Sequence, residues 1–404
     1  MLETSLTGQY RRLDRLQLAA VCALMLLGVA FVYSATFARE SAAAIHWYQR
    51  FWVRQVVWYL LGAGAGACVC LADYRVLSRW SLVIYWAMVV LLLAVLVPGI
   101  GSTHGWGARR WIDLGFFQFQ PSEFAKLAFI IAEANYLSRP QEELRAPANI
   151  LKALGLILIP FALIMKEPDL GSALVLIPTA FLMMYVAGVP KKFLLKLLGA
   201  VIVLSALFIV DVLFLPQQWR INVEDYQRRR LLVYFGKDYD PPPGASKAER
   251  ERLWKQQFDD SHNVRQALIS VGSGGLLGTG WRQGTQNILG YLPRSVAHND
   301  FIFSVIAEEK GFVGSVTVLT LYGLILLTGV GIAGQARDRL GKLLTVGVVT
   351  LLFSHVFINI GMNIRIMPVT GVPLPLLSYG GSSVVVSLIA IGLMQNVFMY
   401  RKAY

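Results

Sequence analysis

Apolar runs long enough to cross a lipid bilayer recur along this chain, and they limit its fold more than any other feature. A membrane-spanning helix needs about 20 mostly apolar residues. The sequence predicts about ten such helices, separated by short polar segments and one long one. They are expected at residues 16–36, 51–71, 81–96, 121–137, 150–165, 172–189, 193–215, 312–333, 343–360 and 383–399.

The composition favours a membrane protein as well. The 404 residues are 56% hydrophobic and only 15% charged, and the mean hydropathy is +0.55. A soluble chain would carry about 25% charged residues. A membrane β-barrel would show short segments of alternating hydrophobicity, whereas these runs do not alternate. We therefore predict an all-α polytopic membrane protein, with residues 1–404 forming a single integral membrane domain.

The net charge of +13 reports on topology rather than on nucleic acid. Lysines and arginines stand mostly at the ends of the apolar runs, and no nucleic-acid-binding motif accompanies them. Basic loops mark the cytoplasmic side. With an even number of helices, both termini are expected to be cytoplasmic. The first run has no small-residue cleavage site after it and is expected to be a retained helix.

One long polar segment, residues 216–300, interrupts the pattern and is predicted to be an extracytoplasmic loop between the seventh and eighth helices. Within it, Ser246 and Glu249 fit a capping box and predict a short charged helix. The apolar side of that helix would comprise Leu253, Trp254 and Phe258. This side is equally consistent with contact to the membrane surface or a partner and with packing on the protein itself.

A second unusual segment, residues 367–383, is rich in proline and glycine between two apolar runs. Non-helical backbone at membrane depth is tolerated only where protein or a water-filled cavity surrounds it. We predict a re-entrant segment before the tenth helix, facing the outer cavity.

Charged residues at membrane depth are costly, so each is a candidate for function. Glu123 and Lys126 are three residues apart on one helix face; a substrate role and a buried ion pair that fixes helix packing both remain open. Arg109 and Arg110 are suited to hold a diphosphate, although interfacial anchoring explains them too. Asp169 is suited to cap the next helix or to take part in catalysis.

The most informative acid is Asp300, which follows a segment with six glycines between residues 272 and 284. Such glycines suit a backbone that approaches a ligand closely, but their spacing fits neither the dinucleotide fingerprint nor the P-loop. His298 lies two residues before Asp300, and Glu308 lies two turns into the next helix. A general base on a sugar hydroxyl and an N-cap explain Asp300 equally well.

Five motifs, in order along the chain, resemble the SEDS family (shape, elongation, division and sporulation). They are QPSEFAKL, PDLGSALV, GSGGLLGTGWRQGTQ, NDFIFSVIAEEKGFVG and PVTGVPLPLLSYGGSS. The likeness covers essentially the whole chain. The stretch GWRQGTQ is similar to the elongation branch of the family, RodA, more than to the division branch, FtsW.

The resemblance implies a peptidoglycan glycosyltransferase in the bacterial cytoplasmic membrane that polymerises lipid II and releases undecaprenyl diphosphate. It also implies a class B penicillin-binding protein as partner within the elongation machinery. The family's essential acid falls on Asp300, as base for the acceptor sugar. The candidate substrate-binding residues are Arg109, Arg110, Glu123, Lys126, Asp169, His298 and Glu308. A divalent cation, Mg²⁺ or Mn²⁺, is suited to share the charge of the diphosphate.

Three alternatives stay open. The chain would act in division, as FtsW does, or would move lipid II across the membrane without chemistry, or would be a scaffold. Transporters often show repeated halves, and no clear internal repeat is present here. The absence of a repeat favours the enzyme.

Overall fold

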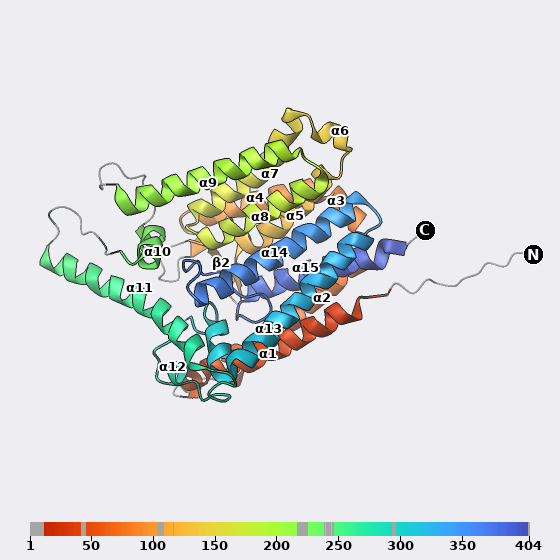
Figure 1. Cartoon of the computed structure of the whole chain (residues 1–404). Helices are drawn as coiled ribbons and strands as arrows, with labels where there is room; N and C mark the ends of the chain where they lie inside the picture. The colour runs from red at the N-terminus through yellow and green to blue at the C-terminus, as the bar shows by residue number, and fades with distance from the viewer. Residues whose placement is uncertain are drawn as a thin grey trace, which may run out of the picture.

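The computed structural model describes residues 12–41, 46–102, 109–115, 117–215, 225–237, 239, 244, 246–292 and 296–402. It is a bundle of long helices with both termini at one end (Figure 1). The helices α10, α11 and α12 lie at the opposite end. We call the end with the termini proximal and the other end distal.

The chain is helical through most of its length. The helices are α1 Arg15–Ser41, η1 Trp47–Gln49, α2 Phe51–Leu71, α3 Tyr74–Arg79, α4 Ser81–Leu96, α5 Pro121–Leu137, α6 Gln141–Leu144, α7 Pro147–Lys166, α8 Leu170–Ala187, α9 Lys191–Phe214, α10 Asp225–Phe235, α11 Lys247–Ser273, α12 Thr285–Ile288, α13 Ile302–Gln335, α14 Arg339–Asn363, α15 Gly381–Met399 and η3 Tyr400–Lys402.

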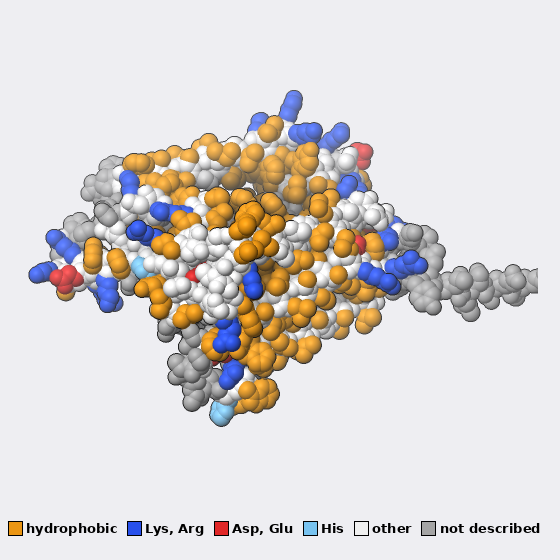
Figure 2. Space-filling view, turned by 60° about the horizontal axis from the view of Figure 1, so that its bottom comes forward, with side chains coloured by type: hydrophobic (Ala, Val, Ile, Leu, Met, Phe, Trp, Pro, Cys, Tyr) orange, Lys and Arg blue, Asp and Glu red, His pale blue; other side chains and the backbone are white. Residues whose placement is uncertain are grey.

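Each predicted span corresponds to one of these helices, and the all-α membrane class is confirmed. Within the described residues, eight helices are long and apolar enough to cross a bilayer, and α4 and α5 are shorter, at 16 and 17 residues. The bounds of α2, α4 and α5 match the predictions. Hydrophobic side chains cover much of the surface of the bundle (Figure 2), as expected where lipid replaces water.

Burial differs strongly among the long helices. In the most apolar part of α9 only 11% of the residues are buried, whereas the figures for α14 and α15 are 72% and 78%. The two helices α14 and α15 therefore form the interior, and α9 lies at the periphery. The site described below is built around α14.

A break at Gly311 divides α13. Gly311 has φ 61°, and a Cβ there would lie 2.5 Å from the backbone nitrogen of Gly278. The predicted span began at residue 312, directly after this break, so the prediction missed the helical residues 302–310. Residues 302–309 are buried in protein, and Glu308 and Glu309 interrupt their apolar pattern.

The glycine-rich segment packs against this break. A Cβ on Gly274 would lie 1.9 Å from the carbonyl oxygen of Ala307, and one on Gly278 would lie 2.2 Å from that of Glu309. The amides of Thr279 and Phe312 complete the contact through hydrogen bonds to Glu308 O and Gly275 O, at 2.9 and 2.8 Å. At Gly274 and Gly278 the absence of a side chain serves close backbone packing. The expectation that the segment approaches a ligand stays a prediction.

The distal segment is more helical than its sequence suggested. The expected short helix is α11, which runs for 27 residues and begins at Ser246, whose side chain accepts a hydrogen bond from Glu249 N. The helix is long because no proline, and no glycine before Gly272, follows its start. Trp254 and Phe258 are 70% and 55% exposed, and their rings stack within α11, on each other and on His262.

A small antiparallel sheet, absent from the predictions, stands between α4 and α5. Its strands are β1 Gly101–Ser102, β2 Trp111–Asp113 and β3 Gln118–Phe119, with Ile112 paired to both Gly101 and Phe119. The sheet places Arg110 just before β2 and Gln120 just after β3, both next to the start of α8.

The segment between α14 and α15 is non-helical and buried. Hydroxyl groups of Tyr59 and Tyr322 donate to the carbonyl oxygens of Leu376 and Pro375, and Gln55 Nε2 donates to Ser378 O at 3.2 Å. Side chains from α2 and α13 thus supply the hydrogen bonds that a helix would have made internally. The segment is held rigidly and reaches the site at Gly371.

Candidate functional site

Polar segments from five parts of the chain meet at the distal end of α14. They are the residues before β2, the start of α5, the turn between α7 and α8, α10, and the turn before α13. The charged side chains they bring into electrostatic contact are Arg110, Lys126, Asp169, Arg230 and Asp300. We call these five residues the charged cluster.

The backbone around Asp300 is fixed on every side. The carbonyl oxygen of Asp300 accepts hydrogen bonds from Asn359 Nδ2 and Asn363 Nδ2, each at 3.1 Å. The two preceding carbonyls, of His298 and Asn299, accept from Tyr379 N at 2.9 Å and from Ser378 Oγ at 2.6 Å. The main chain of the acid is thereby attached to α14 and to the segment before α15.

The side chain of Asp300 is partly exposed and does not cap a helix. The N-cap of α13 is Phe301, and no side chain caps it, so the structure does not support the capping interpretation of Asp300. A Cβ on Gly371 would lie 3.6 Å from Asp300 Oδ2 and 3.5 Å from Arg230 Nη2. The carboxylate of Asp300 and the guanidinium of Arg230 therefore both lie where a side chain at position 371 would stand.

Burial raises the pKa of Asp300 above its usual value, while the charges of Arg230 and Arg110 lower it and that of Asp169 raises it. Desolvation favours the protonated form of a carboxyl group, and nearby cations favour its ionised form. A carboxyl group under both influences is suited to take up and release a proton. This is the electrostatic setting expected of a general base.

The adjacent arginines have different surroundings. Arg110 is 9% exposed; its Nε donates to Glu167 O at 3.2 Å and its Nη2 donates to Pro168 O. Arg109 is exposed to solvent. The structure thus brings Arg110 into the charged cluster, while Arg109 lies on the surface beside it.

Asp169 is the N-cap of α8, as predicted, and its Oδ1 accepts from Ser172 N at 3.1 Å. Its Oδ2 accepts from Gln120 Nε2 at 3.3 Å and from Ser122 Oγ at 3.4 Å. Although burial opposes ionisation, Arg110 and Lys126 hold the pKa of Asp169 below its usual value. Asp169 therefore caps α8 and also belongs to the charged cluster.

Glu123 and Lys126 form the predicted ion pair on α5, with 2.6 Å between Lys126 Nζ and Glu123 Oε1. Both side chains are almost completely buried, and Lys126 Nζ also lies 3.0 Å from His355 Nε2 on α14. The pair connects α5 to α14. Within the pair, Lys126 also lowers the pKa of Asp169.

His298 and Glu308 lie away from the charged cluster. The ring of His298 packs against Phe51 and Tyr379, with centroid distances of 4.5 and 5.5 Å. Glu308 Oε1 accepts from Gln286 N at 2.8 Å at the start of α12, about 12 Å along the helix axis from Asp300. These contacts position the turn before α13 and the glycine-rich segment.

Sequence reasoning missed several residues of the site: Arg230, Glu167, His355, Asn359 and Asn363. The two asparagines carried a readable signal, because polar residues four apart share a helix face and stand in an otherwise apolar run. Arg230 had no such signal, since it is the last of three consecutive arginines.

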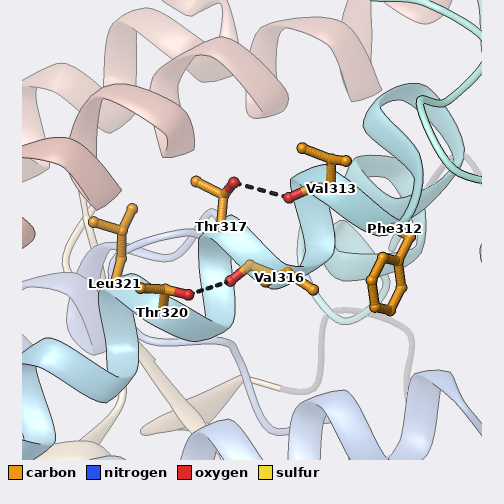
Figure 3. Close-up of a pocket in the computed structure, with 6 residues that line it drawn as sticks. All are labelled: Phe312, Val313, Val316, Thr317, Thr320 and Leu321. Atoms are coloured by element: carbon orange, nitrogen blue, oxygen red, sulfur yellow. Dashed lines mark hydrogen bonds between the residues drawn. The ribbon is translucent and has the colours of Figure 1, made fainter.

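A shallow groove of about 330 Å³ lies elsewhere, on the surface of α13 (Figure 3). Its lining residues are Phe312, Val313, Val316, Thr317, Thr320 and Leu321. The hydroxyls of Thr317 and Thr320 donate to the carbonyls of Val313 and Val316 at 2.8 Å. The groove therefore presents an apolar surface, which suits lipid chains rather than charged substrates.

Fold and site together define a polytopic helical membrane protein with a charged cluster at one end of its bundle. A family model described as the cell cycle proteins FtsW, RodA and SpoVE matches residues 14–403, and the chain belongs to this family. The predicted SEDS membership is thus confirmed.

Two named relatives and one solved structure resemble this chain over most of its length. The chain is 36% identical to the peptidoglycan glycosyltransferase MrdB of Escherichia coli K12 over 330 residues, which cover 81% of this chain and 80% of that protein. It is 34% identical to the probable peptidoglycan glycosyltransferase FtsW of Geobacter metallireducens over 395 residues, covering 96% and 95%. A chain of a peptidoglycan synthase complex that coordinates polymerization and crosslinking superposes with a TM-score of 0.74 at 30% identity, covering 97% of this chain and 99% of that one.

Proposed function

We propose that this bacterial membrane protein is a peptidoglycan glycosyltransferase that polymerises lipid II, with Asp300 as the general base. One observation carries the proposal: a rigidly held, partly exposed acid lies among cations at the distal end of the bundle. A scaffold would not need such a group, and a helix cap is not what Asp300 provides.

In the proposed reaction, the carboxylate of Asp300 takes the proton of the 4-hydroxyl of the acceptor GlcNAc. The oxygen then attacks C1 of the donor MurNAc, and the bond from C1 to the diphosphate breaks. Undecaprenyl diphosphate leaves with the bonding electrons. Arg110 and Lys126 stabilise the developing negative charge, and exposed Arg109 attracts the diphosphate from the surface.

A divalent cation, Mg²⁺ or Mn²⁺, remains part of the proposal. Across the described residues, no three His, Cys, Asp or Glu side chains come close enough to hold a metal ion. A cation that takes part would therefore be bound largely by the diphosphate oxygens and would share their charge.

We further propose that the protein acts in elongation, in the cytoplasmic membrane, with both termini cytoplasmic and a class B penicillin-binding protein as partner. The relation to a chain of a polymerising and crosslinking complex supports the partner. Relatives from both branches match this chain, so depletion distinguishes them: rounded cells support elongation, and filaments support division.

The deciding experiment uses the purified protein with its partner and labelled lipid II. Asp300→Asn should reduce polymerisation by about 10²–10⁴-fold, while folding and partner binding persist. Asp73→Asn at the proximal end is the matched control, because asparagine caps α3 as well as aspartate does. Undiminished polymerisation by Asp300→Asn would exclude this acid as the base.

The same preparation tests transport. Movement of labelled lipid II across vesicles without formation of polymer would favour the flippase instead. The pH profile adds a further check. Because the pKa of Asp300 is raised, activity should fall on acidification while ordinary surface carboxylates are still ionised.

A further inference from the structure

The buried ion pair of α5 has a third member, His355 on α14. His355 is 4% exposed, and its Nε2 lies 3.0 Å from Lys126 Nζ, which also pairs with Glu123 Oε1 at 2.6 Å. The reaction proposed above gives this histidine no role. Because a ring nitrogen of histidine either donates or accepts a hydrogen bond, the protonation of the ring decides what it does to the lysine.

The geometry selects one form of the ring. As the partner of the Glu123 carboxylate, Lys126 is an ammonium group, and an ammonium group has only donors. The hydrogen bond at 3.0 Å therefore requires Nε2 to accept, without a proton. A second proton on the ring would place two cations at this distance inside the protein, which is very costly. The single proton of the neutral imidazole then lies on Nδ1.

The segment before α15 gives independent support for this form. The ring interacts with the backbone of Pro373, and a proline offers only its carbonyl oxygen, because it has no N–H. The ring is therefore the donor in this contact, and Nδ1 is the nitrogen left for it. The contact is loose, since Nδ1 is buried without a well-formed hydrogen bond among the described residues. The contact with Lys126 is the closer of the two.

His355 also shares a face of α14 with the two asparagines that hold Asp300. Asn359 and Asn363 follow it by four and eight residues, and residues four apart lie on the same helix face. Both asparagines donate to Asp300 O, each at 3.1 Å. The three polar residues are spaced about 6 Å apart along the helix axis. One face of α14 thus holds the acid at one place and contacts Lys126 at another.

We propose that His355 is a positioning residue: its neutral ring, protonated on Nδ1, accepts a hydrogen bond from Lys126 and fixes that cation relative to Asp300. The inference rests on the proposed function for the use of this cation in the reaction. The charge of Lys126 acts on Asp169, and that of Asp169 acts on Asp300. A displaced Lys126 would therefore change the electrostatic potential at the proposed base and the stabilisation of the leaving group.

The first test reads the ring directly and needs no activity. Nitrogen-15 NMR spectra of the histidine-labelled full chain in lipid, compared with those of His355→Gln, identify the signals of this ring among those of five histidines. At neutral pH they should show a proton on Nδ1 and none on Nε2. The double variant Glu123→Leu, Lys126→Met should shift the Nε2 signal, because it removes the donor. A proton on Nε2, or on both nitrogens, would overturn the proposal.

The second test compares glutamine and asparagine at position 355. The side-chain oxygen of glutamine reaches about as far as Nε2 and can accept from Lys126, whereas that of asparagine reaches only about as far as Nδ1. His355→Asn should lower kcat for glycan formation by about 10–10²-fold, with KM changed far less, because the buried lysine acts in the transition state. His355→Gln should keep most of the wild-type kcat. Equal kcat values in the two variants would refute the positioning role.

Two controls separate this role from a structural one. Ser354→Ala removes a buried hydroxyl that donates within α14, to Thr350 O at 2.8 Å, and should leave kcat unchanged. In the double variant without the ion pair, His355→Asn should cause no further loss of activity, since it acts through Lys126. An additive loss there would overturn the proposal. A wild type that forms no glycan would instead refute the proposed function, while the NMR spectra still decide whether His355 holds Lys126.

Discussion

Asn359 and Asn396 make the same kind of contact at opposite ends of the bundle. Both are fully buried, and each donates through Nδ2 to two backbone carbonyls. Asn396 binds Val69 O and Ala72 O and closes the proximal junction between α2 and α15. Asn359 binds Val372 O at 2.8 Å and Asp300 O at 3.1 Å, and so positions an acid of the charged cluster.

Two ion pairs show the same difference between the proximal and distal ends of the bundle. Arg75 and Asp338 pair at 2.9 Å near the proximal end, with side chains 40% and 32% exposed. Lys126 and Glu123 pair at 2.6 Å inside the distal half, with side chains only 1% and 3% exposed. Burial of an ion pair costs several kcal/mol per ion, so a buried pair beside Asp169 indicates a use other than stability.

At the proximal end the carboxylate of Asp338 has several partners within the protein. Asp338 caps α14 at Gly341 N, binds Tyr74 and pairs with Arg75. At the distal end neither carboxyl oxygen of Glu167 has a hydrogen-bond partner among the described residues, and Asp300 is held through its main chain while its side chain is partly exposed. The comparison predicts that distal substitutions change function beyond their effect on stability, whereas proximal ones change stability alone.

The largest effect is expected from Lys126→Met. It leaves the carboxylate of Glu123 buried and unpaired, which should cost about 3–5 kcal/mol of unfolding free energy. Adding Glu123→Leu should restore most of the stability, because the double variant buries no charge. Polymerisation of lipid II should stay impaired in the double variant, since the cation near Asp169 is missing. Recovery of activity together with stability would show that the ion pair serves only the packing of α5 against α14.

The two asparagines provide the matched test. Asn359→Ala leaves Val372 O without its donor and removes one of the two donors to Asp300 O. Asn396→Ala leaves Val69 O and Ala72 O without that donor and removes the acceptor of Tyr74 N. Each substitution should cost about 1–3 kcal/mol. Only Asn359→Ala should also lower kcat, by up to about 10²-fold, because a small displacement of Asp300 spoils its geometry. Activity is measured per folded molecule at a temperature where both variants are folded. Equal kcat values in the two variants would remove the functional difference between the ends.

The sequence predicted the bounds of some helices and missed those of others. The span Phe51–Leu71 could be placed because most of it faces outward, where lipid demands a continuous apolar run. The span Pro121–Leu137 is buried in protein and carries charges, and its start was marked by Pro121. The start of α13 could not be placed, because burial in protein tolerates Glu308 and Glu309 where lipid would not.

The site was partly predictable, because a charged residue beside an apolar run is easy to recognise in the sequence. Asp169, Lys126 and Asp300 stand next to apolar runs, where a charge is conspicuous. Arg230 lies in a polar segment full of other charges, and Glu167 stands in the same short turn as Asp169, which alone caps α8. Which of these groups meet depends on contacts between α5, α8, α13 and α14, and such contacts leave no local pattern in the sequence.

The smallest effect is expected for the proximal ion pair. Arg75→Gln removes a pair that is partly exposed and screened by salt, and it should cost only about 0.2–1 kcal/mol. Raising the ionic strength should shrink the difference from wild type further. Asp338→Ala should cost more, about 0.5–2 kcal/mol from the lost cap of α14 alone. Both are measured by thermal unfolding in detergent, with polymerisation per folded molecule unchanged. A large kinetic defect in Arg75→Gln would mean that the proximal end also communicates with the reaction, and the separation of the two ends would fail.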